Sequence, residues 1–240
     1  MQEQALVNLV SFRGPIGSGK TFSANYLVQS FGYRRVSFAD ALKLEVFDAL
    51  WHGMDNGISL FEKAMHKAGT PLFVRYFPKP DTSMRGVSLY YVSDAEKLAW
   101  INANKTSIRS LLQWWGPEYR RSTDENYWVS QWSEKIAAIL ADGGHVVVDD
   151  ARFDNEIDLI MRIGGIHIYI ETDSVQRADR LAARDGITNL GIVGHASEGT
   201  SEETDDRNAV IIKNIAGSTP SYTELLGRSI LYVSAMAEAQ

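Results

Sequence analysis

The chain contains 240 residues, of which 45% are hydrophobic and 22% are charged, and its formal net charge at pH 7 is -6. The length suits one α/β domain with insertions or two small domains, of which we favour the first, and the composition is that of a soluble globular protein. The negative charge argues against non-specific attraction to nucleic acid without excluding a local basic site. The sequence has no cysteine, which excludes disulfides, thiolate catalysis and cysteine-based metal sites, and which suits a reducing compartment such as the cytoplasm. No apolar run approaches about 18 residues, so no membrane span is predicted.

A phosphate-binding loop pattern, G-x-x-x-x-G-K-[ST], lies near the N-terminus. Its residues are Gly14, Pro15, Ile16, Gly17, Ser18, Gly19, Lys20 and Thr21. An apolar, β-favouring run precedes it at 5–12, and helical spacing follows it to Ser30, which is the context this motif requires. The glycines let backbone N–H groups close around phosphate oxygens, while Lys20 is expected to reach the β- and γ-phosphates and Thr21 to ligate Mg²⁺. The loop therefore predicts binding of a nucleoside triphosphate.

Strands and helices alternate after the loop, which predicts a mostly parallel central sheet with helices on both faces. Further strands are expected at 35–38, 146–150, 166–170 and 209–212, and helices at 41–50, 94–115, 126–141, from about 151 to 163, at 174–184 and from 221. A Gly-Pro pair at 116–117 is expected to separate two of these helices. Residues 52–94 are rich in glycine and proline, with one extended run at 87–92. We expect them to form an insertion on the sheet, with residues 1–240 making a single domain.

Two acids follow the buried strand expected at 146–150. In phosphate-loop folds a second strand places an acid beside the metal of the bound nucleotide, and charged groups at the carboxyl end of a central strand line the ligand crevice. Asp149 and Asp150 are the candidates. Because side chains alternate along a strand, both cannot point the same way unless the strand ends between them. Which of them faces the metal stays open, as does the alternative that they cap the next helix.

Several blocks resemble the bacteriophage deoxynucleoside monophosphate kinases. Residues 150–156 (DARFDNE) resemble the family signature D-x-R-[F]-x-N-E, and residues 109–121 resemble R-x-x-L-Q-x-x-G-T-E-x-x-R, followed by an aromatic pair at 127–128. Residues 195–198 resemble a short H-x-[ST]-E segment, and Asn214, Gly217 and Ser218 fit the turn after the last strand. The blocks occur in the family's order over roughly 5–45 and 105–230, and they imply a P-loop kinase fold.

The resemblance also implies roles for individual residues. The acceptor nucleotide would be bound by Arg109, Gln113, Gly116, Pro117, Trp128, Asp150, Arg152 and Glu156. Arg109 and Gln113 are four residues apart, so one helical face can present both, and Glu156 shares a face with Arg152 if the helix has begun there. Asp149 is then the freer candidate for Mg²⁺, directly or through water. Pro117 replaces the family's threonine, which leaves base selectivity open. Ile16 stands where one member of the family carries a substrate-contacting lysine, so the phosphate contacts are expected to differ there.

An arginine-bearing helix at 174–184 resembles the lid helix of nucleotide kinases, with a lid region over about 174–205. Its Arg177, Arg180 and Arg184 are spaced by three and four residues and so lie on one helical face. There they could neutralise the transferring phosphoryl group. The alternative is a solvated basic stripe paired with Asp179 and Asp185.

Together these features predict an enzyme that moves the γ-phosphate of ATP, with Mg²⁺, to a deoxynucleoside 5′-monophosphate and so gives the diphosphate. Lys20, Arg152, Arg177, Arg180 and Arg184 would neutralise charge during transfer. Alternatives are the same donor site with another acceptor, such as a hydroxymethyl pyrimidine in phage DNA or a dephospho-coenzyme, and a non-kinase nucleotide-binding ATPase. A DNA acceptor predicts a basic, aromatic-lined groove from Arg75, Tyr76, Lys79, Arg85, Tyr90 and Tyr91.

The expected partner is a small-molecule nucleotide, with no membrane association. If the chain is phage-encoded, its compartment is the host cytoplasm. The sequence does not decide whether the chain forms a homodimer or which base it prefers.

Overall fold

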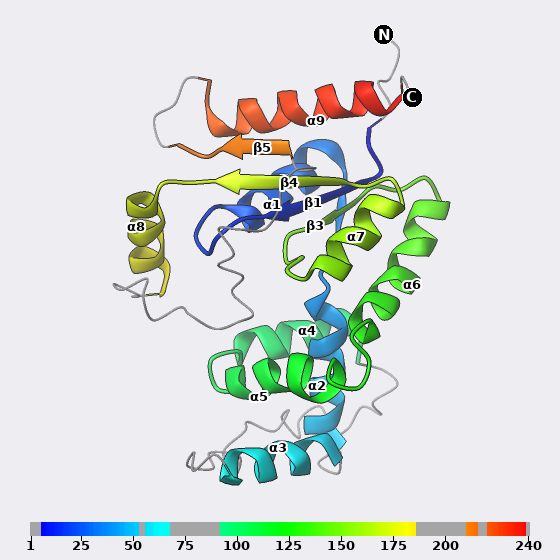
Figure 1. The fold of residues 1–240 in the computed structure, drawn as a ribbon, viewed down its shortest axis with the longest axis vertical. Helices are drawn as coiled ribbons and strands as arrows, with labels where there is room; N and C mark the ends of the chain where they lie inside the picture. Colours follow the sequence, from blue (N-terminus) through cyan, green and yellow to red (C-terminus); the bar gives the residue numbers. More distant parts are fainter. Residues whose placement is uncertain (1–5, 53–55, 68–91, 186–209, 216–219, 239–240) are drawn as a thin grey trace. The chain divides into compact units, whose positions relative to one another are not determined.

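A computed structural model describes residues 6–52, 56–67, 92–185, 210–215 and 220–238 (Figure 1). The chain divides into two compact units, one formed by Met1–Ser37 with Trp132–Gln240 and the other by Phe38–Gln131. Each unit has its own hydrophobic core. The single-domain organisation over 1–240 stays a prediction. None of the helices within the described ranges has the length and hydropathy needed to cross a lipid bilayer.

The first unit is built on a five-stranded, all-parallel sheet with the strand order β2-β3-β1-β4-β5. The strands are β1 (Leu9–Arg13), β2 (Arg34–Arg35), β3 (Val146–Val148), β4 (Ile166–Glu171) and β5 (Val210–Lys213). The helices around it are α1 (Lys20–Phe31), α7 (Asp154–Arg162), α8 (Ser174–Asp185), α9 (Tyr222–Glu238) and the greater part of α6 (Tyr127–Ala141). The predicted α/β class and parallel sheet are confirmed. The second strand is shorter than the expected 35–38.

Helices pack on both faces of this sheet, as expected. Side chains alternate along β1, and Val10 and Phe12 belong to a buried cluster that includes residues of α1 and α9. The members of this cluster from the two helices are Ala24, Leu27, Leu226 and Ile230. On the other face α7 packs against β1 and β4 and buries Ile160. Because both faces are covered, the central strands β1 and β3 are mostly buried.

Several residues of the candidate site directly follow the carboxyl ends of the strands, at one edge of the sheet. Gly14 follows β1, Asp149 follows β3, Thr172 follows β4 and Asn214 follows β5. Figure 1 shows α8 beyond the arrowhead of β4, at this same edge. Open α/β sheets bind their ligands at the carboxyl ends of the strands.

The second unit is helical throughout the residues that the structure describes in it. It contains α2 (Ala39–His52), α3 (Asn56–Lys67), α4 (Asp94–Ala103), α5 (Arg109–Trp114), the π-helical segment η4 (Trp115–Arg120) and the beginning of α6. Its buried core is Val46, Phe47, Ala49, Leu50, Phe61, Ile101, Ile108, Leu111, Trp114, Trp115 and Trp128. Phe61 of α3 meets Trp114 edge-on at 5.4 Å between ring centroids. Helix α3 lies in the stretch 52–94, where no helix was expected, and the expected run at 87–92 falls almost entirely outside the described residues.

The helix expected over 94–115 was wrong in two respects. It is interrupted after α4, where both the backbone N–H and the side-chain amide of Asn104 donate to the carbonyl of Trp100. Such side-chain bonds compete with helix continuation. At the expected break, by contrast, the chain continues as η4, and the N–H of Arg121 reaches back five residues to the carbonyl of Gly116 at 3.1 Å. A wider turn suits Pro117, which has no N–H and whose ring would clash with the carbonyl four residues earlier.

A hydrogen-bonded serine–histidine pair is buried inside the sheet of the first unit. Ser11 Oγ and His167 Nδ1 are 2.7 Å apart, on the neighbouring strands β1 and β4. Burial, with the positive charge of Arg13 as a smaller cause, lowers the pKa of His167 to about 4 from an ordinary value of 6.5. The folded protein therefore holds this imidazole neutral at pH values where the unfolded chain binds a proton.

We predict that this histidine contributes to acid unfolding. The unfolded state binds the extra proton between about pH 6.5 and 4, so stability is complete above this window and falls as pH falls through it, by about 3 kcal/mol from this group. Urea unfolding of His167→Gln should show a smaller loss of unfolding free energy between pH 7 and 4 than the wild type shows. Equal losses in the two proteins would contradict the prediction, whatever the variant's stability at pH 7.

Candidate functional site

The predicted phosphate-binding loop connects β1 to α1, as the motif requires. Gly14, Gly17 and Gly19 all have positive φ values, of 139°, 80° and 107°. A Cβ at Gly14 would lie 2.6 Å from the carbonyl oxygen of Ile170, and one at Gly19 would lie 2.6 Å from Nδ2 of Asn214. The first and last glycines of the motif are thus required both by backbone conformation and by close packing.

The predicted loop lysine lies over the loop itself. Lys20 Nζ donates hydrogen bonds to the carbonyl oxygens of Gly14 at 2.6 Å and Pro15 at 2.9 Å. Its charge is therefore held at the loop, which is where a phosphate group would be cradled by backbone N–H groups. Contact with the β- and γ-phosphates stays a prediction.

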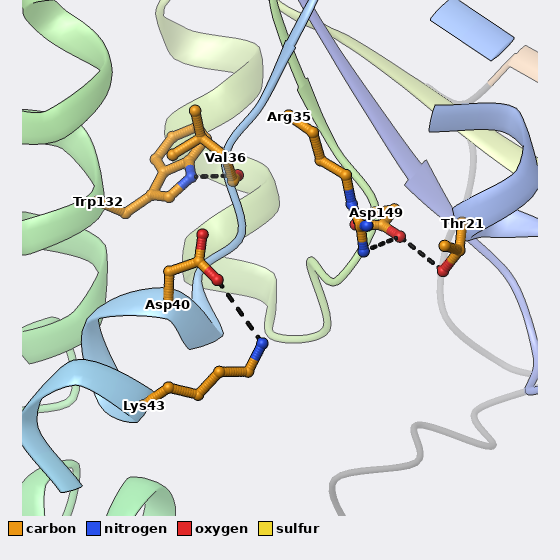
Figure 2. A network of polar contacts seen from close by, with 7 residues as sticks. All are labelled: Thr21, Arg35, Val36, Asp40, Lys43, Trp132 and Asp149. Atoms are coloured by element: carbon orange, nitrogen blue, oxygen red, sulfur yellow. Dashed lines mark hydrogen bonds and ion pairs between the residues drawn. The ribbon is translucent and has the colours of Figure 1, made fainter. Parts of the chain in front are cut away.

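The two predicted metal ligands are in direct contact. The Thr21 hydroxyl donates to Asp149 Oδ2 at 2.7 Å (Figure 2). Strand β3 ends at Val148, and Asp149, just beyond it, is buried, whereas Asp150 is half-buried. Of the two acids, Asp149 is therefore the one beside the phosphate loop. A threonine hydroxyl and a carboxylate are the hard oxygen donors that Mg²⁺ prefers, so this pair fits the ion.

Arg35 was not predicted as a site residue and lies at this same carboxylate. Its Nε donates to Asp149 Oδ1 and its Nη2 to Oδ2, each at 2.8 Å (Figure 2). The contact joins residues 114 positions apart along the chain, so no local spacing could have indicated it. The only signal in the sequence was a basic pair on the short strand β2.

Two of the three predicted lid arginines contact the phosphate loop within the first unit. Arg177 Nε donates to the carbonyl of Ile16 at 3.0 Å, and Arg180 Nη1 donates to that of Gly17 at 3.2 Å. They are thus not a purely solvated stripe. The side chain of Arg184 and residues 186–205 of the expected lid lie outside what the structure describes.

Asn214 ties the end of β5 to the loop. Its side-chain amide donates to the carbonyl of Ser18 at 2.7 Å and accepts from Arg180 Nη2 at 3.3 Å. Thr172 Oγ1 donates to the carbonyl of Asn214 at 3.0 Å. The sequence had placed Asn214 in a family turn without giving it a role, while the other residues of that turn, Gly217 and Ser218, and the block at 195–198 are outside the described ranges.

The acceptor residues expected after β3 include one whose carboxylate caps a helix. Glu156 Oε2 accepts from the backbone N–H groups of Arg152 at 2.7 Å and Phe153 at 3.2 Å. Helix α7 begins only at Asp154, so Arg152 precedes it and the spacing of four residues does not place the two side chains on one helical face. Arg152 is exposed and Glu156 is buried. Their contact with an acceptor stays a prediction.

The remaining predicted acceptor residues belong to the second unit. Arg109 is exposed and Gln113 is half-buried, both on α5, while Gly116 and Pro117 lie in η4. Trp128 is buried on α6, and its indole N–H points to the carbonyl of Gly116 at 3.4 Å. The structure thus brings Gly116 and Trp128 together. Asp150, Arg152 and Glu156 belong to the other unit.

A glutamate that the sequence did not single out collects three donors in the second unit. Glu45, on α2, accepts from the indole of Trp115 at 2.8 Å, from Arg120 Nε at 2.6 Å and from the hydroxyl of Tyr127 at 2.9 Å. The guanidinium of Arg120 also lies over the rings of Tyr119 and Tyr127. Burial, and then the hydrogen bond to Glu45, raise the pKa of Tyr127, which keeps its hydroxyl a donor. Glu45 therefore connects α2, η4 and α6.

Two further points concern basic side chains. Lys43 of α2 pairs with Asp40 at 3.6 Å (Figure 2). The aromatic, basic groove that a DNA acceptor would need was placed on residues 75–91, all of which lie outside the described part of the chain.

The sequence model of a known family, deoxynucleotide monophosphate kinase, matches residues 54–194, which is more than half of the chain. The matched range begins after the phosphate-binding loop and includes α5, η4, Asp149 and α8. No curated protein sequence matches the chain significantly.

Solved structures of several kinases are similar to this fold. A gluconokinase from Sinorhizobium meliloti 1021 has 14% sequence identity and a TM-score of 0.45, covering 98% of this chain and 96% of that one. A dephospho-CoA kinase from Campylobacter jejuni has 18% identity and a TM-score of 0.43, covering 95% and 98%. A sugar kinase from Janibacter sp. HTCC2649 has 12% identity and a TM-score of 0.43, covering 95% and 94%. Scores at this level add nothing to what the family match says about activity.

We predict that Glu45 stabilises the fold more than a neighbouring acid on the same helix does. Glu45→Gln removes the charge and one acceptor oxygen from three donors and should lower the unfolding free energy by about 2 kcal/mol. The matched control is Asp48→Asn, which loses the pair with Lys97 on a half-exposed carboxylate and should cost less than about 1 kcal/mol. Urea unfolding followed by tryptophan fluorescence measures both, and equal losses would contradict the assigned role of Glu45.

Proposed function

Because the chain belongs to the deoxynucleotide monophosphate kinase family and is therefore a nucleotide kinase, we propose that it transfers the γ-phosphoryl group of ATP to the 5′-phosphate of a deoxynucleoside monophosphate, giving the diphosphate. The observation that carries the proposal is the coincidence of two independent features. The family match covers 54–194, and a complete phosphate loop with its threonine–aspartate pair lies mostly outside that range. We also propose that the protein acts in the cytoplasm.

The first unit would bind ATP, the phosphoryl donor. The triphosphate would lie on the backbone of Gly14–Thr21, where added Cβ atoms would collide with neighbouring atoms. Lys20 would contact the β- and γ-phosphates, while Thr21 and Asp149 would hold Mg²⁺, either directly or through water. Bound there with the nucleotide, Mg²⁺ would supply positive charge to the phosphate oxygens.

For the acceptor, each residue is proposed in the role that the family resemblance gives it. Arg109 would bind the acceptor phosphate through paired N–H donors, and Gln113 would read a base edge with one donor and one acceptor. Trp128, with Gly116 and Pro117, would pack against the base. The sugar, phosphate or base would be held by Asp150, Arg152 and Glu156.

The transfer itself needs little covalent chemistry from the protein. The attacking oxygen of a nucleoside monophosphate is already ionised at neutral pH, so no general base is required. Positioning and charge neutralisation would carry the rate. Arg177 and Arg180, whose guanidinium groups already lie at the loop, are the best supported neutralising groups, with Arg152 and Arg184 as further candidates.

The first test of this proposal is turnover by the purified full chain. With ATP and Mg²⁺, ADP release is measured for each deoxynucleoside monophosphate, each ribonucleoside monophosphate and phage-type DNA. We expect release with at least one deoxynucleoside monophosphate. Lys20→Ala should lower kcat on the order of 10²- to 10³-fold, whereas Lys135→Ala, at an exposed position of α6, should leave it unchanged. Release with DNA alone, or with no monophosphate, would contradict the proposal.

A second test locates the acceptor phosphate. Arg109→Ala removes one paired phosphate contact and should raise the acceptor KM on the order of tenfold or more, with the KM for ATP unchanged. Arg162→Ala, at an exposed position of α7, is the control for loss of one arginine. An unchanged acceptor KM in Arg109→Ala would show that the phosphate binds elsewhere.

A further inference from the structure

Arg35 binds Asp149 through two hydrogen bonds, and its side chain is much more exposed than that of the aspartate. Both bonds of the guanidinium fork are 2.8 Å long, one to each carboxylate oxygen (Figure 2). The side chain of Asp149 is 2% exposed, whereas that of Arg35 is 39% exposed. The carboxylate is thus enclosed by the protein, while the arginine side chain is partly exposed to water.

This pairing leaves little of the carboxylate for any further ligand. Each carboxylate oxygen has two lone-pair sites. On Oδ2 both are used, one by Arg35 Nη2 and one by the hydroxyl of Thr21. The site that remains is on Oδ1, the oxygen that Thr21 does not contact. A cation held by Thr21 would reach the carboxylate from the Oδ2 side.

We propose that Arg35 is an internal counter-ion that competes with the Mg²⁺ of the nucleotide for Asp149, and that it leaves Oδ2 when the Mg²⁺–nucleotide complex binds. The inference rests on the proposed donor site at Thr21 and Asp149. Two positive groups at one carboxylate repel each other, and only the guanidinium has water to move into. Arg35 is therefore a positioning residue that keeps a buried acid paired in the free protein and weakens metal-assisted nucleotide binding.

The test uses the full chain and ADP as the probe. The Kd for ADP is measured by calorimetry at saturating Mg²⁺ and again in EDTA. In Arg35→Gln the competing charge is gone, so the Kd with Mg²⁺ should fall on the order of tenfold while the Kd in EDTA changes little. Arg35→Lys keeps a charge without the fork and should lie between Arg35→Gln and the wild type. Arg34→Gln makes the same change of net charge at the exposed neighbour on β2 and should match the wild type.

Thermal unfolding supplies a readout that a purely structural arginine would not move. Without ligand, Arg35→Gln should melt at a lower temperature than the wild type because Asp149 has lost its partner. The upward shift caused by Mg²⁺ and ADP should be larger in the variant than in the wild type, since the complex no longer has to displace the arginine.

Three outcomes overturn the inference. They are a Kd with Mg²⁺ that is unchanged or weaker in Arg35→Gln, an equal fall of Kd in Arg34→Gln, and a ligand-induced thermal shift equal to that of the wild type. Failure of the proposed donor site looks different, because the wild type itself would then show no binding of ADP that depends on Mg²⁺. Failure of the proposed acceptor would appear in the turnover assay and would leave ADP binding unchanged.

Discussion

The buried carboxylate of Asp149 is the constraint on which the arrangement of the donor site depends. An ionised group with this little access to water must be paired, since an unpaired buried charge costs several kcal/mol. Its partners come from two other elements, Thr21 at the start of α1 and Arg35 on β2. One acid at the end of β3 therefore holds the first turn of α1 and the short edge strand at the same point. The stabilising atoms are also those that a metal ion would need, so stability and ligand binding draw on the same oxygens.

The phosphate loop is constrained from its other side by side chains that bind its carbonyl groups. Backbone N–H groups of such a loop turn inward toward an anion, which leaves carbonyl groups to be satisfied elsewhere. Arg177, Arg180 and Asn214 satisfy those of Ile16, Gly17 and Ser18. A guanidinium has five N–H donors, so these bonds do not exhaust either arginine. The same side chains can hold the loop's shape and still present charge to a phosphoryl group. The sequence had not indicated the first of these roles.

The sequence predicted the features that short local patterns determine, and it missed those that depend on contacts between distant residues. The strand–loop–helix unit around Gly14–Thr21 and the valine strand that precedes Asp149 follow from short patterns, and both are confirmed as elements. Arg35 and Glu45 were missed because their partners are distant along the chain, and spacing within one segment carries no such information. The division into two compact units depends on which segments pack together, and local sequence patterns do not indicate this either.

Other predictions were wrong because they assumed a backbone conformation that the chain does not adopt at that point. A helix-face argument joined Arg152 to Glu156, but α7 starts two residues later and the carboxylate turns back to cap it. Proline was taken as a helix stop at Pro117, where the chain instead widens into η4.

In the proposed acceptor site, that widened turn would bear on base selectivity together with the loss of one hydroxyl. The carbonyl of Gly116 accepts from the N–H of Arg121 and faces the indole N–H of Trp128, so both the turn and the tryptophan are fixed by the same oxygen. The indole has no second N–H, so in the proposed acceptor site Trp128 would pack against a base rather than read its edge. Recognition of the base would then fall to Gln113, one turn earlier, whose position depends on how α5 passes into η4. Because Glu45 holds Trp115 and Arg120 at the two ends of that segment, a partly buried carboxylate connects the elements of this unit, as the buried Asp149 does in the other.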